Sequence, residues 1–204
     1  MSLIKSLTEK PWETKGLIGG LNPKGAFDVP AERVALTFFL CVASILFSLF
    51  LVSYYIRMEI ADWIPLAEPG LLWVNTLILV ISSALFQLAR SAGKTENQKL
   101  VKIGLIAGGL FAFAFIFGQL IAWQQLYDQG YFLASNPANS FFYILTGLHG
   151  IHLLGGLWVW SRSSIKLLFG AEVKEIRLSV ELCTIYWHFL LLVWLVLFGI
   201  LSNT

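Results

Sequence analysis

The three histidines of the chain are the residues whose type and spacing could do chemistry. His149 and His152 lie three residues apart in the glycine-rich stretch FFYILTGLHGIHLLGG, and His188 lies in YWHF near the C-terminus. All three fall inside stretches apolar enough to cross a membrane, where ionisable side chains are costly and mark functional candidates. They could ligate a haem, relay protons or hydrogen-bond neighbouring helices.

The depth of the histidines can be predicted from their distance to the ends of the apolar runs. At about 1.5 Å per residue, His152 and His188 lie roughly 12–15 Å from the same side of the membrane. They could therefore meet between adjacent helices, with His149 a turn further outward on nearly the same face as His152. The chain has no CxxCH motif for covalent haem attachment. We therefore favour hydrogen bonds between helices over a relay or a haem held by His152 and His188. Candidate partners are Thr146, Tyr186 and Gln119.

The composition indicates an integral membrane protein. The 204 residues are 57% hydrophobic and only 13% charged, whereas soluble domains carry roughly a quarter charged residues. After a polar segment rich in Pro and Gly come five apolar runs, each near the ~20 residues that span a bilayer as a helix. We predict an all-α, polytopic bundle of five transmembrane helices over residues 34–204, preceded by a cytoplasmic tail over residues 1–33. The predicted spans are 34–56, 71–89, 103–126, 140–161 and 180–201.

Basic residues predict the orientation of the bundle. They fill the N-terminal segment and the second and fourth loops, whereas the first loop offers only Arg57 and the third none. Since cytoplasmic loops are enriched in Lys and Arg, the N-terminus should be cytoplasmic and the C-terminus outside. The basic loops could also bind anionic lipid head groups, or could merely satisfy topology. The candidates for such binding are Arg90, Lys102, Arg162 and Lys166.

Small residues predict close helix contacts. The third span has Gly104, Gly108 and Ala112 at four-residue spacing, and the fourth span has Gly147 and Gly150. Small side chains let the backbones of transmembrane helices approach each other. We expect tight packing at these positions.

Several kinds of chemistry are excluded by what the spans lack. No Asp or Glu lies in the interior of a span, and there is no phosphate loop, dinucleotide fingerprint or nucleophile elbow. The two cysteines show no CxxC spacing. We expect no catalytic residue, no metal or cofactor site and no nucleic-acid partner. A small transporter or channel stays an alternative, although the acid-free interior argues against proton coupling.

Four stretches resemble one known family. FFYILTGLHGIHLLGGLWVW and the later YWHFLLLVWLVLFG closely resemble subunit III of haem–copper terminal oxidases, in its five-helix bacterial form. WVNTLILVISSALFQLA and FGQLIAWQQL also look like their counterparts, so the resemblance covers residues 34–201. By position, His149, His152, Trp187 and His188 match the family's HGxH and WHF motifs, which implies a structural or hydrogen-bonding role for them.

The resemblance implies a cofactor-free accessory subunit of a respiratory oxidase in a bacterial inner membrane. Such a subunit packs against catalytic subunit I, which holds haem and copper, binds phospholipid in a cleft and supports proton uptake. It has no catalytic centre of its own. Subunit III of a quinol oxidase and the accessory subunit of nitric oxide reductase are alternatives, and membership of a respiratory supercomplex stays open.

The sequence departs from the family pattern at two usually acidic positions. Ala43 stands where the family has an acid in the helix that matches the first span, and Leu191 stands where WHF is usually followed by Asp. The acid often seen in the third helix is also missing. A direct role for buried carboxylates in proton supply is therefore not predicted here.

Overall fold

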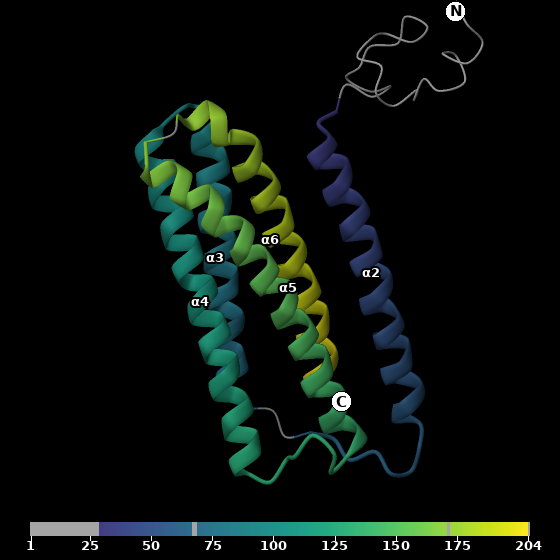
Figure 1. The fold of residues 1–204 in the computed structure, drawn as a ribbon. Coiled ribbons are helices and arrows are strands. Elements are labelled where there is room, and N and C mark those ends of the chain that lie inside the picture. The colour runs from purple at the N-terminus through teal and green to yellow at the C-terminus, as the bar shows by residue number, and fades with distance from the viewer. Residues whose placement is uncertain (1–28, 67–68, 171, 204) are drawn as a thin grey trace, which may run out of the picture. The chain divides into compact units, whose positions relative to one another are not determined.

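The computed structural model describes residues 29–66, 69–170 and 172–203. Within these residues the fold consists of five long helices and no strands (Figure 1). Each helix is long and apolar enough to cross a membrane, which confirms the prediction of an all-α, multi-pass bundle. Most of the predicted N-terminal tail lies outside the described residues. The helices are α2 (Ala31–Met58), α3 (Leu71–Lys94), α4 (Gln98–Asp128), α5 (Pro137–Leu168) and α6 (Val173–Leu201).

The helices extend beyond the predicted spans. α5 continues to Leu168 and α6 already begins at Val173, so most of the predicted basic loop between residues 161 and 180 is helical. The apolar run marks the length needed to cross hydrocarbon, whereas Lys, Arg and Glu outside it are good helix formers. The turns have their own signals. Asn136 caps α5 by accepting from the Ala138 N–H at 3.1 Å, and Gly170, with φ +92°, follows the end of α5.

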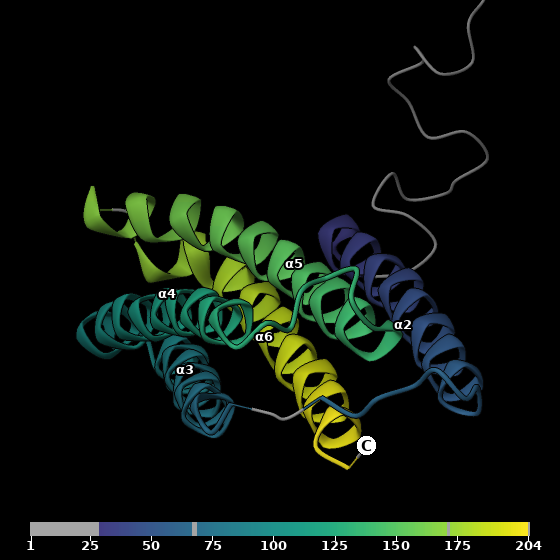
Figure 2. The ribbon, with the colours of Figure 1, turned by 90° about the horizontal axis from the view of Figure 1, so that it is seen from below.

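The chain divides into two compact units, residues 1–37 and Phe38–Thr204. All contacts described below lie within the second unit. There, α3 packs along α4, α4 packs against α5, and α6 packs against both α3 and α5. Figure 2 views these four helices from one end, with α6 beside α3 and α5.

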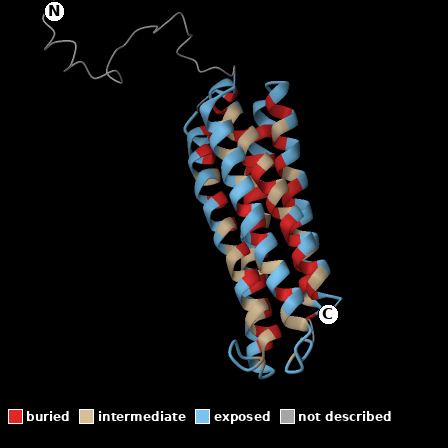
Figure 3. Cartoon of the chain, turned by 90° about the vertical axis from the view of Figure 1, so that its right-hand side faces the viewer, coloured by how far each residue is buried: buried red, intermediate tan, exposed pale blue. Residues whose placement is uncertain are grey.

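Burial is very uneven among the helices. Buried positions on α6 include Trp187, Leu190, Trp194 and Leu197, which line up along one side of the helix. The described part of α2 is buried only at three positions, Ala43, Phe47 and Tyr54. Within the helices, Figure 3 shows a second contrast, between buried inner faces and exposed outer faces. Exposed apolar side chains fit a lipid environment, because lipid tails are as apolar as the side chains of a core.

Candidate functional site

The tryptophan of the WHF motif joins three helices. Trp187 on α6 is fully buried, and its Nε1–H donates to the Ser82 hydroxyl on α3 at 3.1 Å. The Ser82 hydroxyl in turn donates to the carbonyl of Gly108 on α4 at 2.8 Å. The ring also packs on Phe86, with 4.6 Å between ring centroids. Trp187 therefore fixes α6 against the α3–α4 pair.

The neighbouring histidine extends this polar contact. His188 Nδ1 hydrogen-bonds the Ser83 hydroxyl at 2.5 Å, and its Nε2 hydrogen-bonds the Gln87 side-chain carbonyl at 3.1 Å. Because an amide oxygen only accepts, Nε2 carries the proton in the second bond. Both ring nitrogens of His188 are thus engaged by α3.

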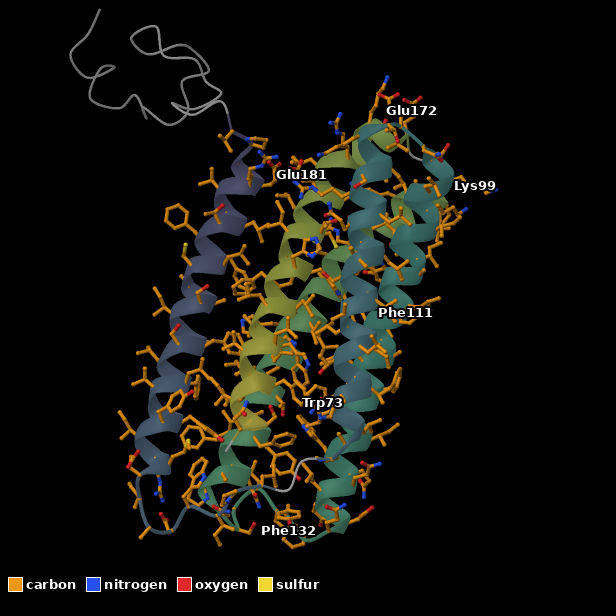
Figure 4. All side chains as sticks on the ribbon, turned by 180° about the vertical axis from the view of Figure 1, so that it is seen from behind. Trp73, Lys99, Phe111, Phe132, Glu172 and Glu181 are labelled. Atoms are coloured by element: carbon orange, nitrogen blue, oxygen red, sulfur yellow. The ribbon has the colours of Figure 1, made fainter. Side chains whose placement is uncertain are left out.

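Further polar contacts follow the same seam between α3 and α6. Towards one end, Trp194 Nε1–H donates to the Thr76 hydroxyl at 2.9 Å. Towards the other end, the Arg90 guanidinium contacts the Glu181 carboxylate at 3.1 Å, with both side chains about a quarter exposed. Glu181 is labelled on α6 in Figure 4. Interhelical hydrogen bonds of this kind stabilise helix pairs in membranes, where hydrophobicity alone provides no driving force.

The two histidines of the HGxH motif contact different helices. His152 Nδ1 donates to the Leu148 carbonyl at 2.8 Å, and its ring packs against Phe39 and Phe47 of α2 at centroid distances of 5.9 and 5.3 Å. The backbone carbonyl of His152 accepts from the Tyr186 hydroxyl at 2.8 Å. This histidine therefore lies where α2, α5 and α6 meet.

His149 is instead buried in the interior of the four-helix group α3–α6. Its exposed fraction is 0%, and its ring packs between Trp194 and Phe115 at centroid distances of 5.3 and 6.0 Å. Neither ring nitrogen has a hydrogen-bond partner among the described residues. The sequence placed both α5 histidines on nearly one face, whereas the structure sends His149 towards α4 and α6 and His152 towards α2.

The residues do not fit a haem held between His152 and His188. An axial ligand needs a free ring nitrogen aimed at the iron. Both nitrogens of His188 are engaged by Ser83 and Gln87, and His152 packs against α2 rather than against His188. Within the described part of the chain, no group of three His, Cys, Asp or Glu side chains could hold a metal ion.

Two glycines of α4 lie at the contact with α3. A Cβ atom at Gly104 would lie 2.8 Å from the Leu85 carbonyl oxygen, and one at Gly108 would lie 3.2 Å from the Phe86 ring. Ala112, one turn further on, is fully buried. These positions allow α3 and α4 to approach more closely than larger residues would permit.

The glycines of α5 behave differently. A Cβ atom at Gly147 would meet the Trp123 ring at an ordinary 3.5 Å, and one at Gly150 would meet no described residue within 4 Å. Gly150 thus does not make the predicted close contact within the described chain, because its face of α5 is open. A close contact that the sequence analysis did not predict lies at Gly109 of α4, directly under the indole of Trp160 on α5. The Trp160 indole N–H donates to the Leu105 carbonyl of α4 at 2.8 Å.

The four candidate lipid-binding bases occupy two environments. Arg90 is paired with Glu181 between helices, whereas Lys102, Arg162 and Lys166 are exposed. The exposed bases lie near the turns that join α3 to α4 and α5 to α6. Lys99 and Glu172, labelled in Figure 4, lie at this same end of the helices. An exposed ion pair joins the two turns, with Lys174 Nζ 3.6 Å from Glu96.

An apolar groove separates part of α2 from α6. It has a volume of about 130 Å³. Its α2 side is formed by Ser44, Phe47, Ser48 and Leu51, and its α6 side by Phe189, Leu192, Val193, Val196 and Leu197. Apart from two hydroxyls the lining is hydrocarbon, so the groove suits an acyl chain or a hydrophobic side chain better than a polar ligand.

The comparisons with known proteins agree on one family. Residues 33–202 match the family model described as cytochrome c oxidase subunit III. The chain is 30% identical to the cytochrome c oxidase subunit 3 of Synechocystis sp., over 96% of this chain and 88% of that protein. It is 29% identical to that of Thermostichus vulcanus, over 86% and 89% of the two chains. A cytochrome bo(3) ubiquinol oxidase subunit 3 of Buchnera aphidicola is 28% identical, over 65% and 68%.

Proposed function

Because the chain belongs to the cytochrome c oxidase subunit III family, we propose that it is a non-catalytic accessory subunit of a respiratory haem–copper oxidase. In this role it stabilises catalytic subunit I, which carries the haem and copper, in a bacterial inner membrane. The observation that carries the proposal is the engagement of the motif residues. Trp187 and His188 both hydrogen-bond α3, so they act as structural contacts between helices and not as cofactor ligands.

Phospholipid binding is the second part of the proposal. The groove between α2 and α6 is apolar, and its position in the membrane-spanning region suits an acyl chain. Head groups of other lipids would be held by the exposed bases Lys102, Arg162 and Lys166. These bases lie near the turns that begin α4 and α6, whereas the groove is lined by the C-terminal half of α6. Arg90 is a weaker candidate, because Glu181 already neutralises it.

Support of proton uptake by this subunit is indirect in our proposal. Ala43 occupies the usually acidic position of the first span, and it is buried on the α2 face between Phe39 and Phe47. Both rings contact His152, so an apolar cluster occupies the place where a carboxylate would act. The subunit would therefore sustain proton uptake by keeping subunit I and its lipids in place.

The proposed orientation puts the N-terminal tail and the basic turns in the cytoplasm and the C-terminus outside. It is supported by the clustering of basic residues near the α3–α4 and α5–α6 turns. Reporter fusions after Lys99 and after Tyr131 test it. Cytoplasmic activity at the first site and external activity at the second are expected, and the reverse pattern would contradict the topology.

A quinol oxidase is the alternative partner complex, since the Buchnera relative is named as a subunit of a ubiquinol oxidase. The two complexes differ in their electron donor and in their haems. In our proposal this chain contacts neither the donor nor the haems directly. A redox difference spectrum of the purified complex and its rates with cytochrome c and with quinol separate them.

The decisive experiment is affinity purification of this chain from native membranes in mild detergent, followed by mass spectrometry. Recovery with a large multi-helix haem–copper subunit is expected. A strain lacking the chain should lose activity faster during turnover and retain fewer of the other subunits. The proposal fails if the chain is recovered alone, or if its deletion changes neither turnover lifetime nor subunit retention.

A further inference from the structure

Asn75, Gln119 and His149 are buried polar side chains of the four-helix group α3–α6 that have no hydrogen-bond partner among the described residues. The buried hydroxyl of Ser164, nearer the other end of α5, also lacks one. Asn75 on α3 and His149 on α5 have exposed fractions of 0%, and Gln119 on α4 is 6% exposed. All six of their side-chain nitrogen and oxygen atoms are buried and lack a hydrogen-bond partner among the described residues. Buried polar groups in native proteins nearly always have partners, so three such side chains together need an explanation.

The three side chains lie at one level of the bundle. A Cβ atom at Gly118 would collide with the Asn75 amide oxygen, so Asn75 lies against the residue that precedes Gln119. Towards α5, Phe115 contacts the His149 ring, and Trp123 Nε1–H donates to Thr146 at 3.1 Å. Phe115 and Trp123 flank Gln119 by one helical turn each. Gln119 therefore lies level with both Asn75 and His149.

The two aromatic neighbours of His149 do not supply its missing bonds. His149 is packed against the rings of Phe115 and Trp194. Trp194 has an indole N–H, but this already donates to Thr76. This level of the bundle thus contains two amides and one imidazole, all buried and without a partner among the described residues.

We propose that Asn75, Gln119 and His149 form an internal water-binding site in the membrane-spanning core. The two amides each offer donors and an acceptor, and a neutral imidazole offers one of each. Water, with two donors and two acceptors, bridges such mixed groups when they lie too far apart for direct bonds. Bridged in this way, the layer holds α3, α4 and α5 at one register, because sliding any helix would break its bonds to the shared water.

The site is tested by radiolytic labelling of the purified, assembled complex in ¹⁸O-enriched water. Hydroxyl radicals formed from a bound water label the side chains beside it even when they are buried. Label from ¹⁸O is expected on Trp194 and Phe115. Trp187 is the control, since it is equally buried and its indole N–H is likewise bonded, but its ring packs on Phe86 and not on His149. Labelling of Trp194 and Phe115 no faster than that of Trp187 would overturn the proposal.

A variant and a density map sharpen the test. Gln119→Leu should reduce the label on Trp194 to the level of Trp187, whereas Ser164→Ala, a buried position nearer the other end of α5, should leave it unchanged. A map of the wild-type complex that resolves ordered water should show a peak within hydrogen-bond distance of at least two of the three side chains. Direct bonds between the amides and the imidazole, with no such peak, would refute the site.

Discussion

α6 and the part of α2 from Phe38 onward are both apolar helices that could cross a membrane, yet they are held by different means. α6 is buried along much of its length and shares hydrogen bonds with α3 through Trp187, His188 and Trp194. α2 meets its neighbours through the rings of Phe39 and Phe47, and an apolar groove lies between it and α6. Apolar character places both helices in the membrane, whereas small residues and polar contacts decide which helices pack tightly.

The largest effect is expected at the α3–α4 contact. Gly104→Ala should lower the free energy of unfolding by about 1–3 kcal/mol, because the new Cβ would press on backbone and cannot be accommodated without moving a helix. The change is measured by unfolding the purified complex in denaturing detergent, with loss of this subunit from the complex as the readout.

Gly150→Ala is the matched control for that substitution, since its Cβ would meet no described residue. It should leave stability unchanged or raise it by up to about 1 kcal/mol, because Ala is the better helix former. Equal effects of the two substitutions would mean that close approach of α3 and α4 does not stabilise the bundle.

The second largest effect is expected at the Trp187 contact. Trp187→Phe should cost about 2 kcal/mol, because it removes the donor to Ser82 and part of a fully buried ring. Trp158→Phe, at a position 71% exposed on α5, should change stability by less than about 0.5 kcal/mol.

A double substitution tests whether that hydrogen bond itself matters. Ser82→Ala removes the acceptor, so the pair Ser82→Ala with Trp187→Phe should cost less than the sum of the single substitutions. Strict additivity would show that the two side chains act independently and that the ring alone explains the cost.

The sequence predicts which segments form helices, but it does not predict which side of each helix is buried. Five apolar runs of membrane-spanning length predicted five helices, because lipid leaves the backbone few alternatives. The face of each helix was harder to predict. α5 is apolar nearly all round, so periodicity does not separate a buried position such as His149 from an open one such as Gly150.

The polar contacts illustrate what sequence reasoning missed. Asn75, Ser82 and Ser83 were not singled out, although a polar residue inside an apolar run is the signal that could have found them. Trp187 and His188, the partners of Ser82 and Ser83, are more than a hundred positions away along the chain. The rotation of each helix about its axis decides which residues meet across that separation. A local sequence pattern does not predict this rotation.

A third prediction concerns the loosely held helix. Phe47→Ala widens the groove and removes a ring that contacts His152. We expect less bound phospholipid per complex, measured by native mass spectrometry. An acyl chain in the groove would lose its contact with the Phe47 ring. The unfolding free energy of the α3–α6 group should change by less than about 1 kcal/mol, since Phe47 belongs to α2 and not to that group.

Leu49→Ala is the control, because Leu49 is 61% exposed on another face of α2. It should leave the lipid content unchanged. If Phe47→Ala retains all its lipid, the groove is not the lipid site of our proposed function.

The smallest effect is expected where α2 ends. The Arg57 guanidinium donates to Asp62 at 2.6 Å, and this hydrogen bond lowers the pKa of the Asp62 carboxyl below its ordinary value of 3.8. A lowered pKa in the folded state means that the ion pair contributes fully above pH 3.8, and that its contribution is lost as pH falls through the lower folded value. Both groups reach the surface of the protein, so salt should screen the pair.

Infrared spectroscopy of the complex with isotopically labelled aspartate can follow this carboxyl, using Asp62→Asn to assign its band. The protonation midpoint should lie below 3.8 and move up towards that value in Arg57→Gln. It should also move up in high salt, because screening weakens the attraction that favours the carboxylate. An identical midpoint in both proteins would show that the contact does not persist in water. The comparison would then be sharper, because the Arg90–Glu181 pair lies between α3 and α6 and is only about a quarter exposed.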